Sequence, residues 1–265
     1  MKIPSVLIAA ALLVGPASGS QQTVREDAVA KSQAAIGRVL PAIEFVDSDG
    51  RIVNISDFRG RPLLVSLVYT GCADVCPAII ESLYPAVEAA QEALGSESFS
   101  VVTVGFDTRN DSADRMRSFA RERGVDLPNW VFLAGSSASV DQLSDAVGFT
   151  FVPSAGGFDH MAQVSFVDRD GQIYQQLYGG NFSTPAVVEP LKDLVFDRSR
   201  PILSVAGIAE RVKLFCTIYN PNTGRYYFNY SLFIGIAIGL ACLLLVLSWL
   251  VREFLRPRGP GQGLA

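Results

Sequence analysis

Residues Leu63 to Pro77 read LLVSLVYTGCADVCP, an apolar run that ends in two cysteines and a proline. The nearly unbroken apolar part, Leu63 to Tyr69, predicts a central β-strand that is covered on both faces. Apolar residues then repeat at helical spacing from Pro77, a residue suited to the first turn of a helix. The sequence therefore predicts that Cys72 and Cys76 lie at a strand-to-helix junction.

The segments around this junction complete an α/β pattern. Upstream, Asp49-Gly50 supplies the positive φ of a tight turn, which predicts an opening β-hairpin. Downstream, strands and helices alternate, which implies a parallel sheet covered by helices. A second hairpin is predicted around Asp170-Gly171, and a last helix with Thr184 as its cap follows it. This order of strands and helices is that of a thioredoxin-like fold, with a central mixed sheet and flanking helices. The predicted strands are 43–46, 52–55, 63–69, 101–106, 131–133, 164–167 and 172–177, and the helices are 112–123, 140–147 and those starting at 77 and 184.

Both ends of the 265-residue chain are apolar. The first run, Ile3 to Val14, follows Lys2 and precedes small residues, as in a secretory signal peptide, and it is too short to cross a bilayer about 30 Å thick. The second run, Ser231 to Val251, has the length and composition of a transmembrane helix and is followed by Arg252, Arg256 and Arg258. Arginines after a span favour a cytoplasmic C-terminus. Both signals place the intervening domain outside the cytoplasm.

The exported part has 18 basic and 25 acidic residues and a charge of about −7, which argues against nucleic acid as a partner.

The chain is expected to have six parts. The predicted parts are a signal peptide at 1–19, a flexible or partly helical lead-in at 20–38, the thioredoxin-like domain at 39–198, a linker at 199–230, the transmembrane helix at 231–251 and a cytoplasmic tail at 252–265.

The four cysteines, Cys72, Cys76, Cys216 and Cys242, are too few for a disulfide-stapled scaffold. If the helix began at Cys72, the sulfurs of Cys72 and Cys76 would share one helical face, one turn apart. A helix N-terminus lowers thiol pKa values and favours the thiolate, which is both a metal ligand and a nucleophile. A surface disulfide between the same two residues is the alternative that the spacing leaves open.

His160 is the only histidine of the chain and is predicted to lie in a glycine-rich loop ahead of the second hairpin. A lone loop histidine is usually solvated. Thioredoxin-like folds, however, bring this loop against the strand-to-helix junction. Two thiolates from Cys72 and Cys76 and one imidazole are then expected to converge.

These three donors suit copper. Soft thiolates select Cu(I), and an imidazole lets the same site hold Cu(II), whereas zinc would need a fourth ligand or a water. Met161 is a candidate extra ligand, although packing is the usual role of such a methionine. Asp74 and Asp159 are expected to be solvated or to support a ligand.

The sequence resembles the Sco (SenC/PrrC) family of copper chaperones for cytochrome oxidase, which are thioredoxin-like and membrane-tethered. The resemblance rests on residues 69–77, on Gly105-Phe106-Asp107-Thr108-Arg109-Asn110-Asp111, and on Asp159-His160 ahead of residues 164–171. It covers Ile43 to about Leu194. It implies that Cys72, Cys76 and His160 are the copper ligands. Ala73 replaces the proline of many members, and the anchor is C-terminal rather than N-terminal.

The resemblance implies a single-pass inner-membrane protein, with its domain in the periplasm, that delivers copper to the copper centre of cytochrome c oxidase. Its partners would be the oxidase subunit that holds this centre, the membrane, and a thiol reductant that keeps Cys72 and Cys76 reduced. The alternative is an enzyme, a thiol:disulfide oxidoreductase with Cys72 and Cys76 as its redox pair. A copper or redox sensor is a third possibility, and a peroxidase is disfavoured because Tyr69 occupies the position of the expected threonine.

Overall fold

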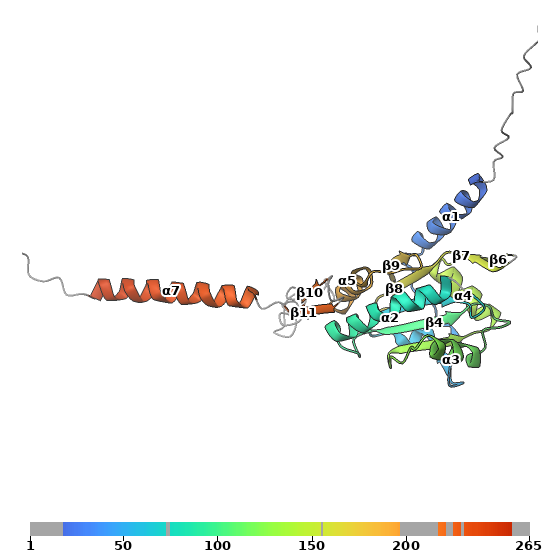
Figure 1. Ribbon diagram of the computed structural model, residues 1–265, viewed down its shortest axis with the longest axis horizontal. Helices are drawn as coiled ribbons and strands as arrows, with labels where there is room; N and C mark the ends of the chain where they lie inside the picture. The colour runs from blue at the N-terminus through green and yellow to red at the C-terminus, as the bar shows by residue number, and fades with distance from the viewer. Residues whose placement is uncertain are drawn as a thin grey trace, which may run out of the picture.

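The computed structural model describes residues 18–72, 75–154, 156–196, 217–220, 225–228 and 231–255 (Figure 1). Most of the predicted signal peptide, Cys216 and the end of the tail lie outside these ranges. The elements are α1 (Ser18–Gln33), β1 (Glu44–Asp47), β2 (Ile52–Asn54), η1 (Ile55–Phe58), β3 (Leu63–Val68), α2 (Val75–Leu94), β4 (Ser100–Gly105), α3 (Ala113–Glu122), β5 (Trp130–Ala134), α4 (Ser137–Val147), β6 (Phe151–Ser154), β7 (Gly157–His160), β8 (Gln163–Val167), β9 (Ile173–Tyr178), α5 (Thr184–Val195), β10 (Thr217–Asn220), β11 (Arg225–Phe228) and α7 (Ser231–Leu255).

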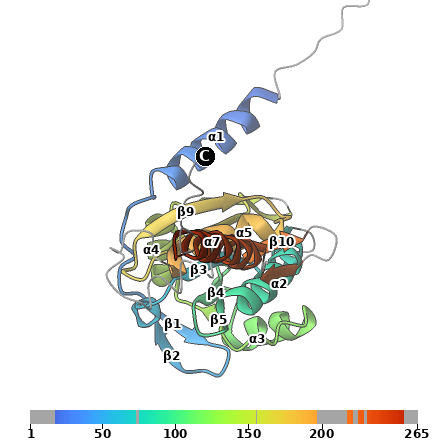
Figure 2. The ribbon, with the colours of Figure 1, turned by 90° about the vertical axis from the view of Figure 1, so that its left-hand side faces the viewer.

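A seven-stranded mixed sheet forms the centre of the domain, in the order β2-β1-β5-β4-β3-β8-β9. The neighbours β3, β4 and β5 are parallel, as the alternation of strands and helices predicts. The hairpins β1–β2 and β8–β9 add antiparallel strands at the two edges. With its covering helices (Figure 2), the sheet confirms the predicted thioredoxin-like fold.

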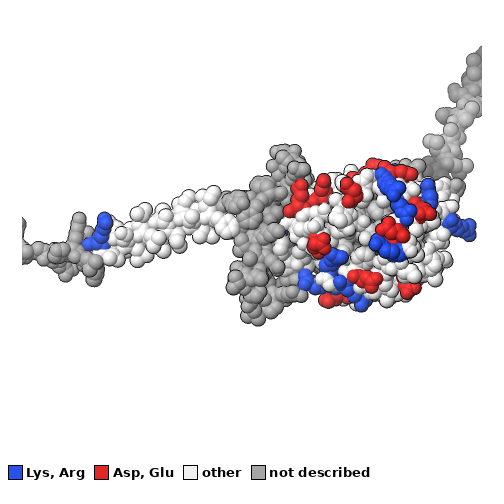
Figure 3. Space-filling view, turned by 90° about the horizontal axis from the view of Figure 1, so that it is seen from below, with Lys and Arg blue, Asp and Glu red and all other residues white. Residues whose placement is uncertain are grey.

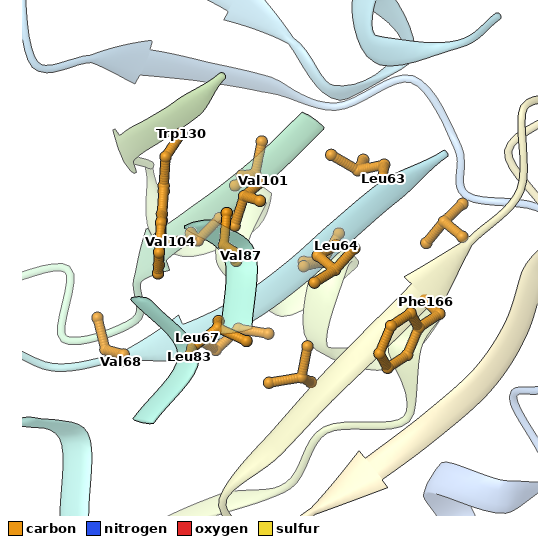
Figure 4. Close-up of a cluster of buried hydrophobic side chains, with 14 of the residues drawn as sticks. Leu63, Leu64, Leu67, Val68, Leu83, Val87, Val101, Val104, Trp130 and Phe166 are labelled. Atoms are coloured by element: carbon orange, nitrogen blue, oxygen red, sulfur yellow. The ribbon is translucent and has the colours of Figure 1, made fainter. Parts of the chain in front are cut away.

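The core lies where α2 covers the middle of the sheet. Every residue of β3 and β4 is buried, which confirms the prediction of a central strand after Pro62. In Figure 4, Leu83 and Val87 of α2 lie over the side chains of β3 and β4, with Trp130 and Phe166 on the flanking strands. This packing fixes the C-terminal end of β3, from which the two-cysteine segment leaves the sheet.

Two glycines account for the predicted turn at Asp49-Gly50 and for the predicted end of the helix at residue 147. Gly50 (φ +82°) turns the first hairpin, and Gly148 (φ +68°) ends α4 in the left-handed conformation. A Cβ at Gly148 would lie 2.6 Å from the backbone oxygen of Lys31, so this position also requires close approach of two backbones. The start of α4 was predicted three residues too late, because Ser136 caps the helix by accepting from the Ser139 N–H.

Three local predictions are wrong. The helix α2 begins at Val75, two residues before the predicted start at Pro77, and since it does not begin at Cys72 the two cysteines do not share a helical face. His160 is not in a loop: it ends β7, which pairs with β6 in a small hairpin that the sequence reasoning missed. The cap position of α5 is Ser183 rather than Thr184, and its side chain makes no capping hydrogen bond.

The segments outside the sheet domain are partly helical. The lead-in is helical in α1, and Ser32 and Ala35 are fully buried, so the packed domain starts before residue 39. Within the predicted linker, β10 pairs with β11. In α7, Phe233 to Arg252 form a span long and apolar enough to cross a membrane. Figure 3 shows acidic and basic side chains mixed on the visible face of the domain and an uncharged surface along most of α7.

Candidate metal centre

The three predicted ligand residues meet beyond the C-terminal end of β3. Cys72 lies in the loop after this strand, Cys76 in the first turn of α2, and His160 at the end of β7. The Cys76 Sγ lies 3.7 Å from the His160 Nε2. The Cys72 Sγ lies 3.5 Å from the backbone nitrogen of Cys76 and accepts its N–H. The fold thus brings the side chains of Cys76 and His160 into contact and places the Cys72 sulfur against the backbone of Cys76.

The two thiols differ in exposure. Cys76 is fully buried, whereas Cys72 is half-buried, and neither forms a disulfide in this structure. Burial raises the pKa of the Cys76 thiol strongly, although its sulfur also accepts the backbone N–H of Tyr69 at 3.5 Å. This is opposite to the lowering expected of a helix N-terminus, because loss of water outweighs the lowering effect of the Tyr69 N–H.

His160 presents a neutral imidazole to the sulfurs. Burial lowers the pKa of His160, so the ring is uncharged at neutral pH. Its Nδ1 lies 3.4 Å from the backbone oxygen of Met161. A carbonyl oxygen only accepts, so the tautomer with a proton on Nδ1 satisfies this contact and leaves the Nε2 lone pair toward Cys76. Met161 therefore meets His160 through its carbonyl group.

A cluster of aromatic rings holds the β6–β7 hairpin in place. Phe106, which follows β4, lies with its ring centroid 5.2 Å from that of His160, 4.8 Å from that of Phe151 and 5.4 Å from that of Phe158. Phe149 adds a further ring 5.7 Å from His160. The sequence reasoning missed this cluster, although the closely spaced phenylalanines before and after the glycines of the hairpin were a readable signal.

Asp111 fixes the loop that carries Cys72. Its side chain is buried, with one carboxylate oxygen accepting from the Thr70 N–H (2.9 Å) and hydroxyl (2.7 Å) and the other from the Asp107 N–H (2.9 Å). Burial raises the pKa of Asp111, against the opposing effect of the bonds from Thr70. The sequence reasoning gave Asp111 no role, although its place after the neighbouring parallel strand pointed to the same edge of the sheet.

The donor set fits a soft metal ion. Within the described ranges, no three or more His, Cys, Asp and Glu side chains form a ready-made metal cluster, and the contacts of the site are pairwise. Asp159 is exposed, and Asp74 lies outside the described residues. Two sulfurs and one imidazole nitrogen suit Cu(I), with the imidazole also supporting Cu(II). The same two sulfurs could instead be joined in a disulfide.

Known proteins share this domain. The family model SCO1/SenC matches residues 32–195. A SCO1 protein homolog of Bacillus subtilis is 26% identical over 147 residues, which cover 53% of this chain and 74% of that protein. The human mitochondrial protein SCO2 homolog is 25% identical over 180 residues, covering 65% and 64%.

Solved structures agree in fold. A crystal structure from Aquifex aeolicus VF5 has a TM-score of 0.55 at 28% identity and covers 63% of this chain and 97% of its own. Bradyrhizobium japonicum ScoI with copper bound has a TM-score of 0.50 at 20% identity and covers 59% and 99%. BsSco, described as a member of the Sco family of cytochrome c oxidase assembly proteins, has a TM-score of 0.51 at 19% identity and covers 60% and 94%. Since the family model matches more than half of its residues, the chain belongs to the SCO1/SenC family.

Proposed function

We propose that this protein binds one copper ion through Cys72, Cys76 and His160 and delivers it to the copper centre of cytochrome c oxidase. One observation carries the proposal: the Cys76 Sγ lies 3.7 Å from the His160 Nε2, across 84 positions of the sequence, and the Cys72 Sγ lies 3.5 Å from the Cys76 backbone nitrogen. Copper is the cargo of this site.

The different exposure of the ligands suits transfer of a cargo ion. Cys76 is fully buried, whereas Cys72 and His160 are half-buried. A partner's ligand can therefore reach the Cys72 sulfur more readily than the Cys76 sulfur. Because burial raises the pKa of Cys76, its thiol is protonated before loading, and copper binding must release that proton.

The family relationship supports the choice of metal and client. A copper-bound structure of Bradyrhizobium ScoI shares the fold, and BsSco is described as belonging to a family of oxidase assembly proteins. The apolar helix α7 is the proposed membrane anchor, with the domain on the periplasmic side of the inner membrane. In that oxidising compartment, a thiol reductant is required to keep Cys72 and Cys76 reduced.

The second candidate is a thiol:disulfide oxidoreductase. It is favoured by the pairing of a half-buried Cys72 with a buried Cys76 whose backbone N–H contacts the Cys72 sulfur. In such an enzyme the accessible sulfur attacks a client disulfide, and the buried sulfur then resolves the mixed disulfide. This chemistry does not require His160, so the histidine separates the two candidates.

The test is a copper titration of the reduced full-length protein in detergent, beside its rate of disulfide reduction. We expect one copper per chain, a loss of that stoichiometry in Cys76→Ser, and slow disulfide turnover. Cys242→Ser is the matched control, because Cys242 lies in α7 and outside the site. Fast turnover without stoichiometric copper would favour the oxidoreductase.

A further inference from the structure

The C-terminal end of α1 packs against the end of α4. Ser32 is fully buried, whereas its neighbours Lys31 and Gln33 are exposed. A Cβ added to Gly148, the residue that ends α4, would lie 2.6 Å from the Lys31 backbone oxygen and 2.7 Å from the Ser32 Cα. The backbones of the two segments therefore touch at this glycine, and a displacement of one must displace the other.

Hydrogen bonds from β9 hold the end of α1 in this place. The Tyr178 hydroxyl donates to the Ser32 Oγ at 3.0 Å and accepts from the Gln33 Nε2 at 2.7 Å. The Lys31 Nζ also lies 2.9 Å from an Asp145 carboxylate oxygen of α4, but both side chains are exposed, and such ion pairs contribute little. The position of α1 is thus fixed mainly by the burial of Ser32 and by its bond from Tyr178.

From Gly148 the chain runs directly into the hairpin that carries His160. Phe149, the next residue, is 1% exposed, and its ring centroid lies 5.7 Å from that of His160. Phe151 then starts β6 and is the strand partner of His160. A displacement of Gly148 therefore reaches the imidazole by two routes, through the ring of Phe149 and through the base of the hairpin.

We infer that Ser32 is a positioning residue of the proposed metal site: it holds the end of α1 against Gly148, and through Phe149 it determines where the His160 imidazole lies. Protein interiors are closely packed and contain few voids that could absorb such a displacement. The inference rests on the proposed function where it concerns copper. The position of the imidazole, in contrast, can be measured without metal.

His160 is the only histidine of the chain, so a protein labelled with ¹³C-histidine gives NMR signals from this site alone. Rings of Tyr69, Phe106 and Phe149 surround its imidazole, with 5.2 to 5.8 Å between centroids. The shielding caused by an aromatic ring depends steeply on its distance and angle, so a displaced Phe149 changes the chemical shift of His160. The measurement uses the reduced, copper-free, full-length protein in detergent.

Ser32→Leu is the main variant, because a larger side chain at a fully buried position pushes α1 and Gly148 apart. Ala93→Leu is the matched control. Ala93 is also buried in a helix, but it lies near the C-terminal end of α2, about 25 Å from Cys76 along the helix axis. Urea unfolding of each copper-free variant verifies that the domain is folded.

Tyr178→Phe is a milder second variant, which tests the inference even if Ser32→Leu does not fold. It removes the hydroxyl that bonds Ser32 and leaves the ring in place. Tyr174→Phe is its control, because Tyr174 lies on the same strand but is 43% exposed.

We expect a changed chemical shift of His160 in Ser32→Leu, a smaller change in Tyr178→Phe, and none in either control. Ser32→Leu should also lower Cu(II) affinity about tenfold, at the lower end of the range for residues that support a ligand. When Phe149→Leu is already present, Ser32→Leu should change the His160 signal much less, because the ring that transmits the displacement is gone.

An unchanged His160 signal in Ser32→Leu and Tyr178→Phe would overturn the inference and leave the proposed function standing. An equal change in Ala93→Leu, or an unchanged Cu(II) affinity in Ser32→Leu, would overturn it as well. An unsubstituted protein that binds no copper, with the His160 signal changed in Ser32→Leu as expected, would instead overturn the proposed function and leave Ser32 as the residue that places the imidazole.

Discussion

Replacing Phe106 with alanine should uncouple the histidine from the cysteines. Phe106 is 2% exposed, and its ring lies against those of Tyr69, Phe151, Phe158 and His160. It therefore forms the surface against which the β6–β7 hairpin packs. Without this ring the hairpin keeps the hydrogen bonds between β6 and β7, but it loses the contact that fixes the distance of His160 from Cys76.

The size of the effect follows from burial. Truncating a fully buried phenylalanine to alanine costs about 3–5 kcal/mol of folding free energy, through lost transfer and a residual cavity. A domain of this kind has about 5–15 kcal/mol in total, so the variant should stay folded at room temperature. Residues that only support a metal ligand typically change metal affinity by about 10–100-fold. We expect a loss of Cu(II) affinity in that range and a smaller loss for Cu(I), which depends more on the sulfurs.

Phe99→Ala is the matched control. Phe99 is also fully buried and belongs to the same chain segment, but it precedes β4, whereas Phe106 follows it. Six strand residues separate the two rings by roughly 20 Å. Both variants should lose similar stability in urea unfolding, monitored on the copper-free protein. Only Phe106→Ala should bind Cu(II) more weakly in a competition titration with a chelator.

Two results would refute this reasoning. If Phe106→Ala binds Cu(II) with unchanged affinity while its stability falls, the aromatic cluster does not position His160. If Phe99→Ala loses as much Cu(II) affinity as Phe106→Ala, the loss results from general destabilisation of the domain and not from the missing contact between Phe106 and the hairpin.

Four further substitutions extend the test. In the same competition titration, His160→Ala should weaken Cu(II) binding by more than the change of about 10–100-fold that is typical of residues that only support a ligand. It should weaken Cu(I) binding less than Cu(II) binding. Equal affinities for the unsubstituted protein and the variant would show that the histidine is not a ligand. Asp111→Asn should lower the free energy of unfolding by about 1–3 kcal/mol, because its amide nitrogen cannot accept the Asp107 N–H. Since burial raises the pKa of Asp111, the folded state binds this proton more tightly than the unfolded chain. The carboxyl contributes stability that is present below its ordinary pKa of about 4 and is lost as the pH rises through the raised pKa. The difference in the free energy of unfolding between the unsubstituted protein and Asp111→Asn, measured by urea unfolding, should therefore become smaller from about pH 3 upward. A difference that grows with pH would contradict this. Cys242→Ser and Cys216→Ser should leave copper stoichiometry unchanged; a loss in Cys216→Ser would mean that the linker reaches the site.

Elements fixed by strong local signals could be predicted from the sequence. The apolar run after Pro62 has no alternative to burial on both faces, and it forms β3 at the centre of the sheet. The Asp-Gly turns and Gly148 have few conformations open to them, so the two hairpins and the end of α4 were predicted correctly. For such segments local preference and tertiary packing agree.

The site was harder to predict because tertiary packing shapes it. The start of α2 at Val75 depends on how the loop after β3 is held by Asp111, which is 41 positions away from Thr70. The β6–β7 hairpin is short, contains a proline and two glycines, and is held by contacts with Phe106 that no local pattern encodes. The raised pKa of Cys76 likewise follows from burial, which outweighs the lowering effect of the Tyr69 N–H. The placement of the three proposed ligand residues at one end of β3 could be predicted from the fold, but the groups that position them could not.

The most direct test of the copper site compares the reduced and the oxidised full-length protein. The account predicts that the reduced protein binds one copper per chain. After oxidation of Cys72 and Cys76 to a disulfide, verified by mass spectrometry, the protein should lose this binding, because His160 alone remains as a ligand. If the oxidised protein still binds one copper as tightly as the reduced protein does, the ion is not held by these sulfurs and the proposed site is wrong.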